Sequence, residues 1–123
     1  MTVIFLCCFA LSSRSGLAFS PRTKTTLIGQ WAQAGGSCDG DTTEVYKTDG
    51  SYETDTAKGR WSISGKTLTR RVELAGEAGE KLGPLTPPEV TSVIIVRLDG
   101  HVRIERWPDK KSHQFVRCKS RSQ

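Results

Sequence analysis

Two arginines lie among apolar residues on stretches that alternate like β-strands, and they are the side chains in this chain best suited to chemistry. Arg70 has the phase of Leu68 and Val72, and Arg106 has the phase of Ile104. Because strand side chains point alternately to two faces, this phase places both guanidinium groups on the inner face of a sheet. There they would bind a carboxylate or phosphate through paired N–H donors. The alternative is that both lie near strand ends and reach water.

The candidate ligand site consists of the residues that alternation places on the inner face with these arginines. It comprises Trp61, Ile63, Leu68, Arg70, Val72, Ile94, Val96, Ile104 and Arg106. A mostly apolar surface with two cationic groups would suit a small hydrophobic or amphipathic anion. We therefore expect such a ligand inside the fold.

The sequence contains no pattern typical of an enzyme or a metal site. His101 and His113 have no spacing to Ser, Asp or Glu that favours a catalytic triad. They also lack zinc-ligand spacing with the cysteines. Asp39, Asp41 and Glu44 depart from the EF-hand pattern, so a solvated turn is a better interpretation than a calcium site. We predict a non-catalytic protein with no metal and no cofactor.

The first 18 residues have the pattern of a signal peptide. The apolar run at residues 3–11 is too short to cross a bilayer as a helix, and small residues follow at 16–18. Cleavage there would remove two of the four cysteines and leave Cys38 and Cys118. In an exported protein, of the periplasm or the extracellular space, such a pair is expected to form one disulfide.

Turn residues divide the rest of the chain into short alternating segments. Asp49-Gly50 and Asp99-Gly100 each separate two such segments, which predicts hairpins, the first with a type I′ turn. We expect eight strands, at residues 28–33, 43–48, 51–54, 59–63, 67–74, 90–98, 101–107 and 112–118. Eight antiparallel strands form a barrel or a sandwich, and closure into a barrel removes exposed edges. We predict an all-β fold, a small up-and-down β-barrel.

The expected order is a signal peptide at 1–18, a flexible tail at 19–26, a barrel at 27–118 and a basic tail at 119–123. Residues 75–89 are rich in Gly and Pro, which predicts a surface loop, with a lid over a ligand as the alternative. We expect a monomer without a membrane span.

Charge is distributed unevenly along the chain, whose formal net charge is +5. Residues 38–55 hold six acids and one base, whereas residues 97–121 hold eight bases and three acids. A basic face for an anionic partner is one interpretation. The bases are scattered along strands and match no nucleic-acid motif, so we favour a solvated surface and expect no nucleic-acid partner.

Gly29 and Trp31 on the first expected strand, with Arg117 on the last, resemble the signature of lipocalin-like (calycin) barrels. The resemblance implies a small bacterial exported barrel in which Trp31 closes one end and Arg117 packs over its ring as a cation–π pair. The chain is shorter than the full-sized family and lacks its carboxy-terminal helix. The alternative function is a protein-interaction module of the cell envelope, such as a lipocalin-like protease inhibitor whose amino-terminal segment, here residues 19–26, enters the protease cleft.

One expectation conflicts with another. In an up-and-down barrel Cys38 and Cys118 would lie near opposite ends, about 20–30 Å apart at about 3.3 Å per residue. Three solutions remain open: the Gly-rich loop at 34–41 folds back, a strand is miscounted, or the disulfide is absent.

Overall fold

The computed structural model describes residues 21–39 and 43–119. The expected signal peptide, the first two residues of the expected tail and residues 120–123 lie outside the described residues. The elements are α1 (Pro21–Leu27), β1 (Gly29–Gln33), β2 (Glu44–Tyr46), β3 (Ser51–Thr54), β4 (Ala57–Ser64), β5 (Thr67–Ala75), β6 (Gly83–Leu98), β7 (Val102–Arg106) and β8 (Ser112–Arg117). Within this part of the chain, no helix has the length and hydrophobicity needed to cross a bilayer.

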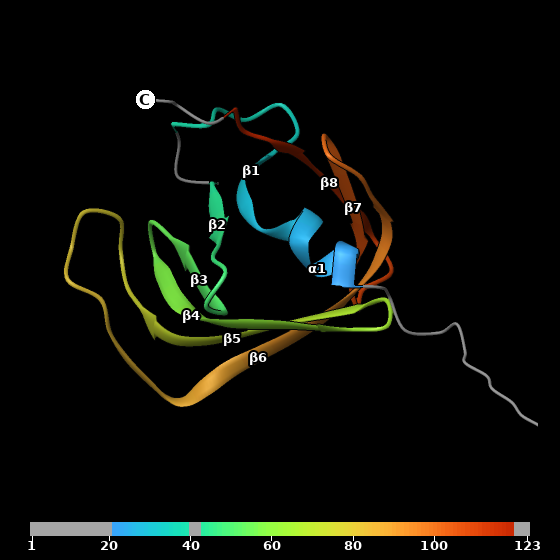
Figure 1. Ribbon diagram of the computed structural model, residues 1–123. Coiled ribbons are helices and arrows are strands. Elements are labelled where there is room, and N and C mark those ends of the chain that lie inside the picture. The colour runs from blue at the N-terminus through green and yellow to red at the C-terminus, as the bar shows by residue number, and fades with distance from the viewer. Residues whose placement is uncertain (1–20, 40–42, 120–123) are drawn as a thin grey trace, which may run out of the picture.

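The strands form one closed antiparallel barrel in sequence order (Figure 1). Each strand pairs with the next, and β1 pairs with β8, where Trp31 lies opposite Arg117 and Gln33 opposite Phe115. The predicted all-β, eight-strand barrel is confirmed. Because β1 pairs with β8, neither of these two strands is left as a free edge of the sheet.

The first Asp-Gly pair makes the predicted hairpin with different turn geometry. Gly50 has a positive φ of 89°, but Asp49 does not, so the turn is not type I′. Instead, the Asp49 carboxylate accepts a hydrogen bond from the backbone N–H of Ser51 at 2.9 Å. Asp99 does the same for His101 and Val102, at 2.8 and 2.9 Å. Asp therefore fixes both turns through its side chain.

The expected surface loop at residues 75–89 is wrong in its second half. β6 begins at Gly83, which pairs with Ala75, and Pro84 pairs with Leu74. Three prolines misled the prediction, since Pro lacks an N–H and interrupts central strands. Here β7 pairs with β6 only from Ile94 onward. The prolines therefore lie in the half of β6 that pairs with β5 alone. Their missing N–H groups interrupt no hydrogen bonds to a strand on the other side.

The expected flexible tail is also partly wrong, because residues 21–27 form α1. Leu27 at the end of the helix is 0% exposed, and its carbonyl accepts the indole N–H of Trp31 at 2.8 Å. In Figure 1, α1 lies within the ring of strands. The helix therefore covers one end of the barrel and places Leu27 in its packed interior, while Lys24 and Thr25 stay exposed.

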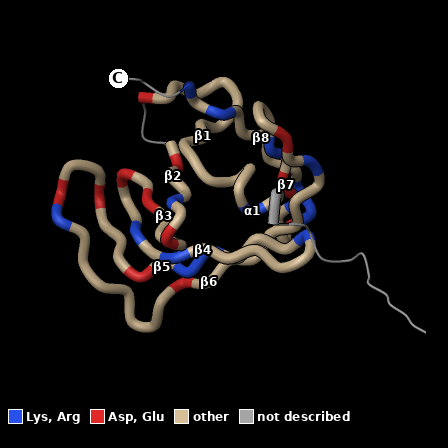
Figure 2. The backbone as a smooth tube through the Cα atoms, in the orientation of Figure 1, with Lys and Arg blue, Asp and Glu red and all other residues tan. Residues whose placement is uncertain are grey.

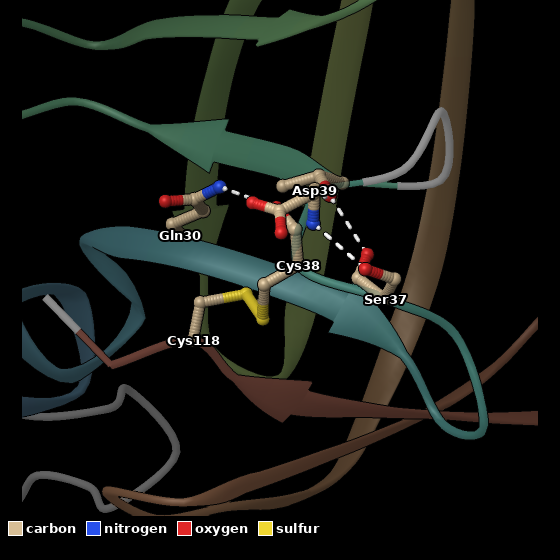
Figure 3. Close-up of a disulfide and its surroundings, with 6 residues drawn as sticks. Gln30, Ser37, Cys38, Asp39 and Cys118 are labelled. Atoms are coloured by element: carbon tan, nitrogen blue, oxygen red, sulfur yellow. Dashed lines mark hydrogen bonds between the residues drawn. A yellow bond between two sulfur atoms is a disulfide. The ribbon is translucent and has the colours of Figure 1, made fainter. Parts of the chain in front are cut away.

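Cys38 and Cys118 form the predicted disulfide, with their Cα atoms 5.8 Å apart. The loop after β1 folds back along its own strand, so that the Gln30 side chain donates to the Cys38 carbonyl at 3.2 Å (Figure 3). The backbone N–H of Cys118 donates to the Gln30 carbonyl at 2.9 Å. The fold-back of the Gly-rich loop is thus the solution to the distance conflict.

Replacing Cys38 and Cys118 together by Ser should destabilise the barrel strongly. The bond spans 80 residues, and the chain-entropy model gives a loss of about 4 kcal/mol in the free energy of unfolding for such a span. Urea denaturation of the two proteins measures the difference. A loss of less than about 1 kcal/mol would show that the bond does not restrict the unfolded chain as expected.

Candidate functional site

Five of the nine residues predicted to line the interior do contribute to it. Trp61, Leu68 and Arg70 are 5%, 0% and 6% exposed. Ile63 and Val72 are half-buried and pack against the same core. These residues belong to β4 and β5, whose hairpin register keeps Trp61 opposite Arg70 and Ile63 opposite Leu68. Alternation therefore assigned the faces of β4 and β5 correctly.

The four remaining residues face outward, so their predicted position is wrong. Ile94 and Val96 are 41% and 52% exposed. Arg106 is exposed, and Ile104 is half-buried between two fully buried neighbours on β7. The prediction failed on β6 because all four residues from Val93 to Val96 are apolar. Alternation of apolar and polar residues therefore cannot show which two of them face inward. On β7 it failed because the residues that face inward are charged.

A network of charged residues crosses the barrel interior, and alternation gave no sign of it. Glu105 on β7 is 0% exposed. Its two carboxylate oxygens accept hydrogen bonds from Nη1 and Nη2 of Arg70, each at 3.2 Å. Nε of Arg103 lies 2.8 Å from the same carboxylate, and the Trp107 indole N–H donates to it at 2.9 Å. One buried carboxylate is therefore shared by two guanidinium groups.

Glu44 on β2 supplies the second carboxylate. One oxygen accepts hydrogen bonds from the Tyr46 hydroxyl at 2.8 Å and from Nη2 of Arg103 at 2.5 Å. The other oxygen accepts a hydrogen bond from the Tyr52 hydroxyl at 3.0 Å. Arg70 closes the network by donating to the Tyr46 hydroxyl at 2.7 Å. Two arginines and two glutamates give no net charge, so this interior requires no bound counterion.

Aromatic rings surround the Arg103 guanidinium. Its central carbon lies 4.0 Å from the ring centre of Phe115 and 5.1 Å from those of Trp31 and Tyr46. Within the described part of the chain, Nη1 of Arg103 has no hydrogen-bond partner. Attraction between the cation and the ring faces compensates in part for this unsatisfied donor.

Protonation equilibria in the network follow from burial and charge. Burial alone raises the pKa of Glu105, but the charges of Arg103 and Arg70 and the hydrogen bonds to its carboxylate outweigh burial, so the pKa lies below its ordinary value. Burial, and next the charge of Glu44, raise the pKa of Tyr46 well above its ordinary value. Glu105 is therefore ionised and Tyr46 is a neutral hydroxyl at neutral pH.

These contacts fill the described barrel interior with the protein's own side chains. Arg70 from β5 reaches Glu105 on β7, Arg103 from β7 reaches Glu44 on β2, and the Tyr46 ring from β2 meets that of Trp61 from β4 with ring centres 5.6 Å apart. The volume in which a guest was expected is thus crossed by ion pairs and rings. A ligand-binding role for the inward-facing set stays a prediction.

Gly29, Trp31 and Arg117 make an interlocked closure at the end covered by α1. The Arg117 guanidinium lies over the Trp31 ring, 4.4 Å from its centre, and donates to the backbone carbonyls of Ile28 at 2.9 Å and of Thr26. Gly29 has a φ of 133°, and a Cβ there would collide with this guanidinium. The geometry matches the contact that the lipocalin resemblance implies, and it explains why Gly precedes the Trp by two positions.

Four outward-facing aliphatic residues of β6 and β7, together with Arg106, form a strip here called the β6–β7 outer face. The aliphatic residues are Val90, Ile94, Val96 and Ile104; Val90 is 56% exposed, and the exposed polar Ser92 lies between Val90 and Ile94. Ile94 lies opposite Arg106. The pairing register shifts between Ile95 and Arg97, so that Val96 has no partner on β7 and Arg97, the next residue, lies opposite Ile104. Groups of exposed aliphatic side chains on one face are a feature of interaction sites.

Charges of both signs are spread over the molecule. Figure 2 shows basic positions around β7 and β8 with acidic ones among them, and both signs in the loop between β5 and β6. His101 is exposed at a turn, whereas His113 stacks on Trp107 with ring centres 3.8 Å apart.

Comparison with known proteins finds no matching family model, no similar curated protein and no similar solved structure. The fold and the geometry above are therefore the basis for any functional conclusion.

Removing one carboxylate from the network should cost far more than removing one from the surface. Glu105→Gln leaves two buried guanidinium groups without their shared partner, and breaking a buried ion pair costs about 3–5 kcal/mol in the free energy of unfolding. Glu53→Gln is the matched control, because its salt bridge with Lys47 is exposed and should change stability little. Equal effects of the two variants in urea denaturation would show that the network does not stabilise the fold.

The lowered pKa of Glu105 predicts a loss of stability in acid. The unfolded chain has the higher pKa, of about 4.3, so it binds a proton at a higher pH than the folded chain. The stabilisation from ionised Glu105 is complete above about pH 5.5 and falls as the pH drops through the lower folded pKa. Denaturation at pH 7, 5 and 3 should show the gap between wild type and Glu105→Gln narrowing toward pH 3. A constant gap would contradict the assignment.

Proposed function

We propose that the chain is an exported, non-catalytic, lipocalin-like β-barrel that acts as a protein-interaction module through its β6–β7 outer face. The observation that carries the proposal is the filled interior. Glu44, Arg70, Arg103 and Glu105 neutralise one another where a guest was expected. Expelling them for a ligand would leave buried charges unpaired, at a cost of several kcal/mol for each ion.

The outer surface supports a protein partner instead. Val90, Ile94 and Val96 are the large apolar side chains most exposed in the described chain, and all three belong to β6. They project from a strand that pairs with β5 up to Ile94 and with β7 from Ile94 onward, so the sheet supports the strip. A rigid apolar strip with a polar rim loses little entropy when another protein covers it.

The disulfide and the closure by Trp31 and Arg117 support the rest of the proposal. A bond of this kind persists in oxidising compartments, which favours export to the periplasm or beyond. The Gly29, Trp31 and Arg117 contact supports a lipocalin-like family relationship.

A barrel-type protease inhibitor is the narrower alternative, but the segment it requires is occupied. Residues 21–27 form α1, and Arg117 holds this segment through the carbonyls of Thr26 and Ile28. Insertion of residues 19–26 into a cleft would require α1 to leave the barrel. The β6–β7 outer face needs no such rearrangement.

Site-specific photocrosslinking in the exporting cell tests the proposal. A benzophenone amino acid at Val96 should give a discrete protein adduct, and one at Lys58, an exposed position on β4, should not. The added change Ile94→Ser should weaken the adduct at residue 96, because it removes part of the apolar contact. Native mass spectrometry of the purified protein completes the test. A co-purifying small molecule together with equal adducts at both positions would overturn the proposal in favour of a ligand-binding barrel.

A further inference from the structure

A groove of about 370 Å³ opens at one end of the β6–β7 outer face. Its apolar wall is made by Ile94, Trp107 and Pro108, and the remaining lining residues are Ser92, Arg106 and Lys110. β6 supplies one side, the end of β7 another, and the turn from Trp107 to Ser112 the third. Three elements therefore converge on one concave site at the edge of an apolar strip.

The aromatic wall is held in place before any partner arrives. The Trp107 indole N–H donates to Glu105 at 2.9 Å, and its ring stacks on His113 at an angle of 27°. The first contact ties the groove to the buried network. A ring fixed in this way pays little conformational entropy on binding, which is typical of aromatic anchor positions in interfaces.

The turn that forms the third side is equally well fixed. The backbone N–H of Lys110 donates to the Trp107 carbonyl at 2.7 Å, and that of Trp107 donates to the Lys111 carbonyl at 2.9 Å. Lys110 has a φ of 71°, a conformation that favours Gly over residues with side chains. The turn thus keeps a lysine at a position where the backbone would prefer Gly.

The cations of the groove are uncompensated. Arg106 and Lys110 are both exposed. Among the described residues, neither side chain makes a hydrogen bond or an ion pair, whereas Arg71 and Arg97 on the neighbouring surface pair with Glu73 and Asp99. Two free cations beside an indole ring and two aliphatic groups match a partner that presents a carboxylate next to an apolar side chain.

We propose that this groove receives an acidic, apolar segment of the partner protein, with an aromatic or aliphatic side chain against Trp107 and Ile94 and carboxylates at Arg106 and Lys110. The inference rests on the proposed function and specifies the partner's chemistry. A second copy of this chain is the poorer occupant, because a twofold contact places the same patch on both subunits and would bring Arg106 and Lys110 against their own counterparts.

Titration of the exported, disulfide-intact chain with short peptides tests the inference. Binding is monitored by NMR through the ¹⁵N–¹H signals of the Trp107 indole and the Arg106 amide. The probes are acetylated, amidated peptides: Glu-Glu-Phe-Glu-Glu, the same peptide with Lys for every Glu, and the same peptide with Ala for Phe. The acidic Phe peptide should bind and shift both signals. Arg106→Gln and Lys110→Gln should each weaken its binding about fivefold, while Lys58→Gln, an exposed base on β4, should leave it unchanged.

Each other outcome overturns the inference in a recognisable way. Equal binding of the Lys peptide, or no effect of Arg106→Gln, would exclude recognition by charge. Binding of 3-phenylpropionate as tight as that of the acidic peptide would identify a site for small amphipathic anions. If no peptide binds but the crosslink at Val96 is still formed, the groove inference is wrong and the proposed protein-interaction function remains. If neither peptide binding nor the crosslink is observed, the proposed function is wrong as well.

Discussion

The sharing of Glu105 between Arg70 and Arg103 is the constraint on which the rest of the barrel depends. A carboxylate that is 0% exposed can remain ionised only if its partners replace the lost water, and here two guanidinium groups and the Trp107 indole do so. Glu44 then balances the second positive charge. Because each member would be costly to bury alone, the four residues must enter the barrel together.

This requirement fixes the geometry of strands that are distant in sequence. Glu44 lies on β2, Arg70 on β5, and Arg103 and Glu105 on β7, so the network joins both halves of the barrel. A shift of β7 by one residue would turn both of its charged side chains outward and leave the other two unpaired. The network therefore selects one register, in addition to any stability it adds. The disulfide and the Arg117 contact act at the barrel's seam, where β1 meets β8.

Much of this architecture could be predicted from the sequence, and the failures have a physical cause. Turn residues and alternation located all eight strands to within a few residues, apart from the early start of β6. The pairing of Cys38 with Cys118 followed from the cysteine count. The faces of β6 and β7 could not be predicted, because alternation assumes that apolar residues face inward. Arg103 and Glu105 violate that assumption, and only the three-dimensional meeting of Glu44, Arg70 and Glu105 explains how they can.

The charged interior and the exposed residues of the β6–β7 outer face have one common origin. Side chains on a strand alternate between its two faces, so placing Arg103 and Glu105 inside obliges Ile104 and Arg106 to face outward. The β6 register against β7 then places Ile94 opposite Arg106 on that same outer surface. Val93 and Ile95 fill the space that remains inside. The network that occupies the centre of the barrel therefore also determines which side chains of β7 lie on its outer surface.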